Sequence, residues 1–313
     1  MDLAYHRRMR IAVLLPCYNE GPIIASVVTA AKRALPHAAV YVYDNNSTDD
    51  TAAAARSAGA ILKREERQGK GNVVRRMFAD VDADVYVLLD GDGTYAIDTA
   101  PDLVRTLTEN NLDMVTGVRV ADGGAAYRNG HRLGNRLITG FASTLFGMPI
   151  TDMLSGYRVF SKRFVKSFPA LSSGFEIETE LTIYALGMRM RTGEVSVAYG
   201  ARANGTASKL RTYTDGIRIM RTIAILLKEE RPLQVLGSAA AVFLIAGVLL
   251  GVPIVLEFFA TGFVPRLPTA VLATGLILLA ALCLFAGILL DSIARTRREL
   301  RWLNYLSYGS PTE

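Results

Sequence analysis

The chain of 313 residues carries 35 lysines and arginines against 29 aspartates and glutamates, a formal net charge of +6. The length suffices for one large domain and a smaller part, and two cysteines are too few for a disulfide-rich scaffold. The positive charge suits an anionic membrane surface or anionic substrates. No DNA- or RNA-binding pattern accompanies it, so we expect no nucleic-acid partner.

The first 120 residues alternate between strand and helix patterns. Short apolar runs predict strands at 11–15, 40–43, 85–89 and 114–118. Helical spacing, capping residues and glycine stops predict helices at 22–35, 49–58, 71–82 and 99–110. This alternation predicts an α/β fold with a mostly parallel sheet, and ligands of such sheets gather at the carboxyl ends of the strands.

The pattern changes after about residue 127, where arginine-rich helices surround one long strand at 194–199. The segment 217–227 has apolar residues along one helical face. We expect it to be either an interfacial helix beside a membrane or an ordinary surface helix of the domain.

Two uncharged stretches follow, at 232–256 and 267–290. Each exceeds the roughly 20 apolar residues that a helix needs to cross a bilayer, and the alternative is a pair of buried core helices. Basic residues flank both outer ends, whereas the loop between the stretches holds Arg266 alone. The positive-inside bias therefore predicts a multi-pass protein of the cytoplasmic membrane, with its large domain and both termini in the cytoplasm.

These patterns predict four parts in chain order. They are a domain at 1–210, an amphipathic juxtamembrane helix at 211–231, two spans with a short outer loop at 232–290, and a basic cytoplasmic tail at 291–313.

Asp90-Gly91-Asp92 follows directly after the buried strand at 85–89. Two carboxylates in this position can bind Mg²⁺ or Mn²⁺ together with a diphosphate, and the cation would stabilise charge on a leaving group. The alternative is a tight Asp-Gly turn between strand and helix.

Other strand ends also carry polar residues. Pro16-Cys17-Tyr18-Asn19-Glu20 follows the first strand, and Asp44 ends the second, where a carboxylate can accept hydrogen bonds from a nucleobase or ribose. We expect the residues from Ser47 to Asp50 to act as helix caps and no more. Lys70 lies between two glycines at a helix start, a shape suited to a phosphate.

Several segments in this order carry a resemblance to a known family. LLPCYNE, VYDNNSTDDT, RQGKGNVVRRMF and VLLDGDGTY resemble the GT-A domain of family-2 inverting glycosyltransferases. TDMLSGYRVFSK, GFEIETEL and ARANGTASKL resemble the polyprenyl-phosphate branch, typified by dolichyl-phosphate mannose synthase. The likeness covers roughly residues 10–230, and two C-terminal spans also fit bacterial members.

The resemblance implies specific site residues. The implied nucleotide-sugar site contains Pro16, Tyr18, Glu20, Asp44, Lys70, Asp90, Gly91 and Asp92, with Asp90 and Asp92 at the metal. Thr94 stands where related enzymes have a glutamine that reaches the metal, so the third protein ligand is open. The implied acceptor-phosphate site contains Arg119, Arg128, Arg132, Ser155, Arg202 and Ser208. The alternative for its arginines is that they are solvated charges on the protein surface.

Asp152 matches the position of the family's catalytic base. A phosphate monoester is already anionic at neutral pH and needs no strong base, so Asp152 either acts as the base or orients the acceptor or Arg158. Glu176, Glu178 and Glu180 fit a helix N-terminus that favours acids, and we expect no further role of the last two.

The resemblance implies inverting transfer of a sugar from a nucleotide-sugar to polyprenyl or dolichyl phosphate. A UDP-sugar is the expected donor and GDP-mannose the alternative, and we also expect a homo-oligomer. Two other functions compete. A processive polysaccharide synthase would carry Gln-x-x-Arg-Trp, but Arg298 stands in place of the glutamine before Arg301-Trp302. A non-catalytic membrane scaffold would not need intact Asp44, Asp90 and Asp92.

Overall fold

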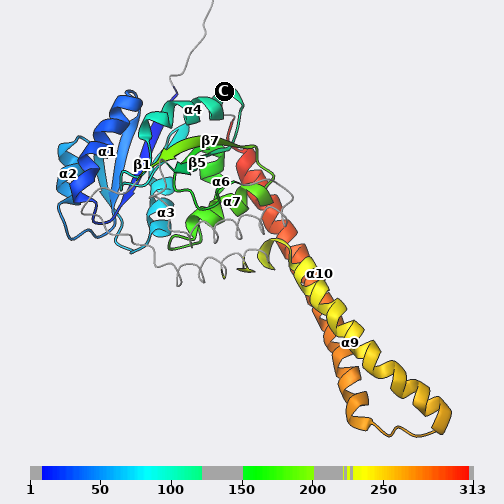
Figure 1. The fold of residues 1–313 in the computed structure, drawn as a ribbon. Coiled ribbons are helices and arrows are strands. Elements are labelled where there is room, and N and C mark those ends of the chain that lie inside the picture. The colour runs from blue at the N-terminus through cyan, green and yellow to red at the C-terminus, as the bar shows by residue number, and fades with distance from the viewer. Residues whose placement is uncertain (1–8, 122–150, 201–220, 222–223, 226–227, 310–313) are drawn as a thin grey trace, which may run out of the picture. The chain divides into compact units, whose positions relative to one another are not determined.

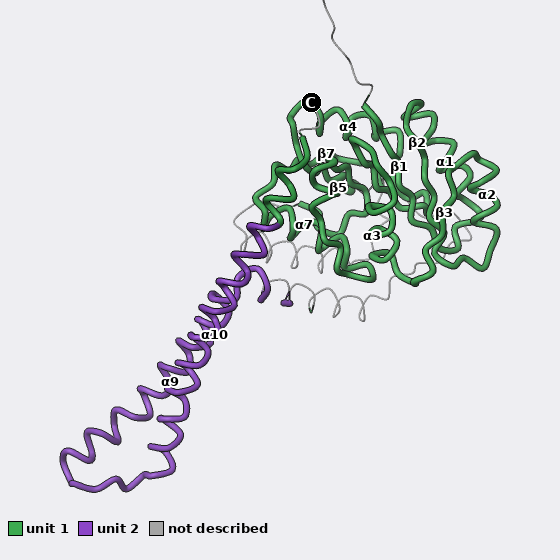
Figure 2. Tube along the Cα trace, turned by 180° about the vertical axis from the view of Figure 1, so that it is seen from behind, with its two compact units in different colours: residues 1–222, 301–313 green, residues 223–300 purple. Residues whose placement is uncertain are grey.

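The structure is a computed structural model that describes residues 9–121, 151–200, 221, 224–225 and 228–309. Two compact units make up the chain (Figure 2). Residues 1–222 and 301–313 form the first unit, and residues 223–300 form the second. The predicted helix at 211–231 lies largely outside the described residues.

A seven-stranded sheet forms the centre of the first unit, in the order β3-β2-β1-β4-β6-β5-β7. The strands are β1 (Ile11–Cys17), β2 (Ala39–Asp44), β3 (Ile61–Arg64), β4 (Val85–Leu88), β5 (Met114–Ala121), β6 (Arg158–Ser161) and β7 (Thr192–Tyr199). β6 runs antiparallel to its neighbours β4 and β5, and the other pairs are parallel. The predicted α/β class with a mostly parallel sheet is therefore confirmed.

Helices cover both faces of this sheet (Figure 1). They are α1 (Gly21–Ala34), α2 (Thr51–Ser57), α3 (Lys70–Asp80), the 3₁₀ turn η1 (Ile97–Thr99), α4 (Ala100–Glu109), α6 (Lys162–Ser167) and α7 (Ile177–Gly187). Buried side chains of α1, α2 and α4 share one hydrophobic core, and those of α3, α6 and α7 share the other. The two layers hold the strand ends, and the loops that follow them, in fixed positions.

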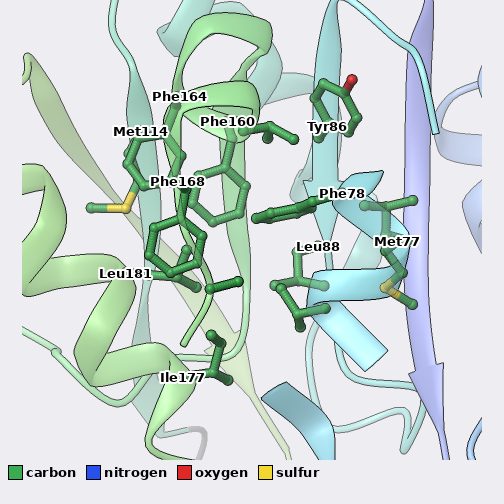
Figure 3. Packing of buried hydrophobic residues seen from close by; sticks show 14 of the residues in the cluster. Met77, Phe78, Tyr86, Leu88, Met114, Phe160, Phe164, Phe168, Ile177 and Leu181 are labelled. Carbon is green, nitrogen blue, oxygen red and sulfur yellow. The ribbon is translucent and has the colours of Figure 1, made fainter. Parts of the chain in front are cut away.

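The alternation along β4 shows how one strand serves both cores. Tyr86 and Leu88 belong to the core under α3 and α7, whereas Val85 and Val87 belong to the core under α1 and α4, because successive side chains of a strand point to opposite faces. An aromatic cluster fills the first of these cores (Figure 3). Phe160 stacks on Phe164 with ring centroids 4.8 Å apart, and Phe78 meets Phe160 edge-on at 5.7 Å.

The C-terminal end of α10 (Leu267–Leu306) packs within the first unit. The Tyr305 hydroxyl donates to both carboxylate oxygens of Asp113, at 3.1 and 3.2 Å, and Asp113 is 1% exposed. The Arg163 guanidinium lies over the Tyr305 ring and also pairs with Asp113. The sequence predicted a basic cytoplasmic tail at 291–313; α10 continues to Leu306, and residues 301–313 belong to the first unit.

Tyr305→Phe should destabilise the first unit. The change leaves the ring packing intact and removes the hydroxyl bound to a buried carboxylate, which we expect to cost about 1–3 kcal/mol. Thermal unfolding of the full-length protein in detergent measures the loss. Tyr308→Phe is the matched control, because its hydroxyl makes no side-chain hydrogen bond within the described part of the chain. Equal melting temperatures for wild type and Tyr305→Phe would contradict this role.

The second unit consists of α9 (Pro232–Thr261) and most of α10. Both helices are long and apolar enough to cross a membrane by length and composition. Glu257 is the one charged residue of α9, and most large apolar side chains of both helices are exposed, with Phe259 at 80%. The alternative of buried core helices therefore finds no support. Gly247 lets the helices approach closely, since a Cβ there would lie 3.1 Å from the Ala273 carbonyl oxygen.

Candidate active site

A cavity of about 270 Å³ lies at the carboxyl ends of β1, β2 and β4, where the sequence predicted a ligand site. All predicted nucleotide-sugar residues except Asp44 line it: Pro16, Tyr18, Glu20, Lys70, Asp90, Gly91 and Asp92. They come from the end of β1 and the loop after it, from the loop after β4 and from the start of α3. The topology thus brings residues as far apart in sequence as Pro16 and Asp92 into one pocket, because parallel strands end at the same edge.

Asn45, rather than the neighbouring Asp44, lines this cavity. The Asp44 carboxylate is buried and accepts from the Ser47 backbone N–H at 3.2 Å. Asn45 donates to the Glu65 and Arg67 carbonyls at 2.8 Å each and accepts from the Gly69 N–H at 2.7 Å. It therefore fixes the segment that leads into α3. The sequence analysis missed Asn45, although its place directly after the last residue of β2 was a usable signal.

The residues after β2 do more than cap α2. Ser47 Oγ accepts from the Asn19 N–H at 2.9 Å, Thr51 Oγ1 from the Glu20 N–H at 2.8 Å, and Asp49 Oδ2 from the Gly21 N–H at 2.9 Å. The expectation that this segment only caps a helix is wrong. Its side chains fix the loop between β1 and α1, which forms one wall of the cavity.

The Asp90-Gly91-Asp92 segment is held tightly in place. A Cβ at Gly91 would lie 2.5 Å from Cys17 Sγ, so a larger residue does not fit there. Asp92 Oδ1 accepts from Thr94 Oγ1 at 2.6 Å and from the Thr94 N–H at 3.1 Å. Thr94, which stands where the resemblance implies a glutamine, thus orients Asp92.

The two carboxylates fit a divalent cation. Both line the same cavity, and their hard oxygen atoms are the ligands that Mg²⁺ and Mn²⁺ prefer. In the described part of the chain, no group of three or more His, Cys, Asp or Glu residues could hold a metal. The described residues would therefore supply two ligands, and a bound diphosphate and water would complete the shell, as is usual for Mg²⁺.

The Lys70 ammonium lies between two carboxylates. It donates to Asp90 Oδ1 in a close contact and to Glu178 Oε1 at 2.6 Å. Burial lowers the pKa of Lys70, but the charges of Asp90 and Glu178 outweigh burial and raise the pKa well above its usual value. Lys70 is therefore a cation at neutral pH and places a fixed positive charge in the cavity.

The three glutamates near the start of α7 each have a specific partner. Glu178 binds Lys70, and Glu180 accepts from the Leu171 and Ser172 N–H groups at 2.8 and 2.7 Å. Glu176 accepts from the Gly174 N–H at 3.1 Å. The expectation that Glu178 and Glu180 serve only as acids at a helix N-terminus is wrong, because both are buried and bound.

The segment before α7 forms a fixed wall of the cavity. Arg75 donates to the Ala170 and Leu171 carbonyls at 2.6 and 3.0 Å, and Glu180 accepts from backbone N–H groups of the same segment. A Cβ at Gly69 or Gly71 would lie 2.2 Å from the carbonyl oxygen of Ser173 or Ser172, respectively. Phe175, which the sequence analysis missed, lines the cavity from this wall.

Arg119 and Asp152 form a bidentate ion pair. Arg119 Nε and Nη2 donate to Asp152 Oδ2 and Oδ1 at 2.7 Å each, and the Arg119 backbone N–H reaches Oδ2 at 3.3 Å. The guanidinium also lies 5.5 Å from the Tyr199 ring centroid. The pair therefore joins one predicted acceptor-phosphate residue to the predicted base.

The structure corrects the pairing of Asp152 with Arg158. Arg158 is fully buried and donates to the Met153 and Ser155 carbonyls at 2.6 and 3.0 Å. Burial lowers the pKa of Arg158 to about 10. This arginine holds the 153–155 segment, and the carboxylate of Asp152 binds Arg119 instead.

The segment of Asp152 and Ser155 reaches the cavity beside Asp90 and Lys70 through Gly156. A Cβ at Gly156 would lie 2.4 Å from Asp90 Oδ2 and 3.0 Å from Lys70 Nζ. Ser155 Oγ donates to the Gly117 carbonyl at 2.6 Å. Four predicted acceptor-site residues, Arg128, Arg132, Arg202 and Ser208, lie outside the described residues.

Residues 12–168 match the family model described as "Glycosyl transferase family 2". The chain belongs to this family. The glycosyltransferase AglJ of Haloferax volcanii is 32% identical over 292 residues, which cover 92% of this chain and 95% of that protein. The dolichyl-phosphate hexose transferase of the same organism is 29% identical over 221 residues, covering 71% and 95%.

A solved structure shares the fold of this chain. Glucosyl-3-phosphoglycerate synthase of Mycobacterium tuberculosis, in complex with Mn²⁺, UDP and phosphoglyceric acid, superposes with a TM-score of 0.56 at 23% identity. The match covers 71% of this chain and 78% of that chain. This family-2 glycosyltransferase therefore has the GT-A fold, as the sequence predicted.

Proposed function

We propose that this family-2 glycosyltransferase moves a sugar from a nucleotide-sugar, with UDP as the nucleotide, to polyprenyl phosphate and inverts the anomeric configuration. The convergence of Asp90, Asp92 and Lys70 on one cavity carries the donor side of the proposal. The apolar helices α9 and α10 support a lipid acceptor, as does the name of the dolichyl-phosphate hexose transferase.

On the donor side, the cavity residues bind and orient the nucleotide diphosphate. Asp90 and Asp92 would hold Mn²⁺ or Mg²⁺, which when bound offsets the charge of the diphosphate. Lys70 adds a second positive charge where the leaving group departs. Phe175, from the segment before α7, adds an apolar side chain to the lining of the same cavity.

On the acceptor side, an oxygen of the lipid phosphate attacks the anomeric carbon. The bond from that carbon to the diphosphate breaks, and its electron pair leaves with the nucleoside diphosphate. The phosphate is already anionic, so Asp152 need not remove a proton. Asp152 instead aims Arg119 at the phosphate, and Ser155 holds the adjacent segment against Gly117. We assign Arg128, Arg132, Arg202 and Ser208 to the same phosphate.

For the location, we propose that α9 and α10 cross the cytoplasmic membrane, with the glycosyltransferase unit and both termini in the cytoplasm. Lys228 and Arg231 before α9, and Arg295, Arg297 and Arg298 near the end of α10, support this orientation. A homo-oligomer remains a prediction of the sequence, as do the domain boundaries.

An assay with labelled donors tests this function. Full-length protein in liposomes is mixed with Mn²⁺, labelled UDP-glucose, UDP-galactose, UDP-N-acetylglucosamine or GDP-mannose, and polyprenyl phosphate. We expect one UDP-sugar to give an organic-phase product that mild acid releases, and no product with the unphosphorylated polyprenol. A long polymer would favour a processive synthase. A parallel reaction replaces the lipid with 3-phosphoglycerate, and a soluble labelled product there would refute the lipid acceptor. No product with any donor would refute the proposed transferase activity.

A further inference from the structure

The contact of Lys70 with Asp90 has a consequence for metal binding. Asp90 is one of the two carboxylates that fit a divalent cation, yet its Oδ1 accepts from the Lys70 ammonium. The side chain of Lys70 is 8% exposed, so water screens this contact little. A divalent cation arriving alone must displace the ammonium from Asp90 or bind beside a fixed positive charge.

Glu178 offers the ammonium a second position. Its Oε1 accepts from Lys70 at 2.6 Å, its side chain is 8% exposed, and it lies on α7, apart from the loop that carries Asp90. In the described part of the chain, its carboxylate makes no other side-chain hydrogen bond. Because α7 is packed into the core through Ile177 and Leu181, Glu178 keeps its place when Asp90 changes partner.

We propose that Glu178 is a positioning residue that keeps the Lys70 ammonium in the donor cavity when a divalent cation takes over Asp90. Lys70 thereby couples metal binding to nucleotide binding. The diphosphate gives the displaced ammonium a new anionic partner, so each ligand makes the other bind more tightly. This inference rests on the proposed function, since it assigns the cavity to a metal and a nucleoside diphosphate.

The coupling is measured as Mn²⁺ affinity with and without UDP. Electron paramagnetic resonance of free Mn²⁺ follows its binding to full-length protein in detergent. For the wild type we expect UDP to raise Mn²⁺ affinity at least about tenfold, which corresponds to about 1.4 kcal/mol. Wild type that binds no Mn²⁺ even with UDP would refute the proposed metal-dependent donor site. Equal binding with and without UDP would refute the coupling alone.

Lys70→Met should raise the affinity for Mn²⁺ alone and reduce the gain in Mn²⁺ affinity that UDP gives. Without the ammonium, Mn²⁺ alone should bind at least about fivefold more tightly than to wild type, and the gain from UDP should fall below threefold. The double variant Lys70→Met/Glu178→Gln should behave likewise. It serves if the single variant fails to fold, because it leaves no buried glutamate without a partner. Arg67→Met is the matched control: Arg67 is exposed, three residues from Lys70, and loses the same charge. An equal change in Arg67→Met would reduce the effect to net charge and overturn the proposal.

Glu178→Gln separates positioning from simple repulsion. A carboxylate that acted only by its charge would repel UDP, so its removal would tighten UDP binding. A positioning residue gives the opposite sign, and we expect UDP in saturating Mn²⁺ to bind about fivefold more weakly to Glu178→Gln. When Glu178→Gln is made in the Lys70→Met background, it should alter UDP affinity less than twofold, because no ammonium remains to be held. Tighter or unchanged UDP binding to Glu178→Gln in the wild-type background would overturn the role.

Discussion

Asp92→Asn is expected to lower turnover by about 10²–10³-fold and to abolish Mn²⁺-dependent UDP binding, while the protein still folds. Thr94 explains why the fold should survive. The two hydrogen bonds that Thr94 donates both go to Oδ1 of Asp92, an atom that asparagine retains as an acceptor. The negative charge that would hold a cation is lost, and electrostatic groups of this kind are typically worth that factor. Initial rates of sugar transfer and calorimetric titration of UDP with Mn²⁺ measure the two effects.

The control for this variant is Asp98→Asn. Asp98 is exposed on η1 and pairs with Arg33 at 3.5 Å, so the same charge is lost six residues away without touching the cavity. We expect its turnover to equal that of the wild type. Chelation with EDTA should silence the wild type and leave Asp92→Asn at its residual rate. Full activity of the wild type in EDTA, or normal turnover of Asp92→Asn, would remove the metal from the proposed function.

The second large effect concerns Asp152. Asp152→Asn should lower kcat/KM for the lipid phosphate about 10–10²-fold, because asparagine offers one acceptor oxygen where Arg119 now binds two. This factor corresponds to one charge-assisted hydrogen bond of about 1.5–3 kcal/mol. Asp152→Ala should lose more, since no acceptor remains. UDP affinity, measured separately, should stay within about threefold of the wild type.

A double variant distinguishes this orienting role from that of a base. Arg119→Lys cannot form the bidentate pair and should show about the same loss as Asp152→Asn, and Arg119→Lys/Asp152→Asn should be no worse than either. An obligatory base would instead cost about 10²–10⁴-fold on its own and add to the effect of Arg119→Lys. Additive losses, with equal rates for the asparagine and alanine variants from pH 5.5 to 8, would establish the base and exclude the orienting role.

The sequence predicted most of the fold because its signals are local. The strand that precedes Asp90 is a continuous apolar run, and α1 begins with proline in its first turn, so both were found within a few residues of their bounds. The antiparallel strand β6 was not predicted. Its four residues, starting at the fully buried Arg158, have no alternation or apolar run, and the strand forms through its pairing with β4 and β5.

The candidate site was likewise predicted only in part from the sequence. Asp90, Asp92 and Lys70 could be recognised because each stands at a strand end or a helix start. The contact of Lys70 with Glu178 spans 108 positions, and that of Arg119 with Asp152 spans 33, so neither leaves a periodic trace in the chain. Glu178 looked like an ordinary acid in the first turn of a helix. Its burial depends on the packing of α7 against the sheet, which local sequence does not encode.

The two glycines at the start of α3 have a consequence for how this protein can change during evolution. Gly69 and Gly71 touch the Ser173 and Ser172 carbonyls so closely that any β-carbon would push the segment before α7, held by Arg75 and Glu180, out of place. The two positions tolerate no gradual enlargement, because alanine is the smallest possible step and already collides with backbone. Sequence change around the cavity is therefore directed to other lining positions, such as Gln68 and Phe175, while Gly69 and Gly71 stay fixed.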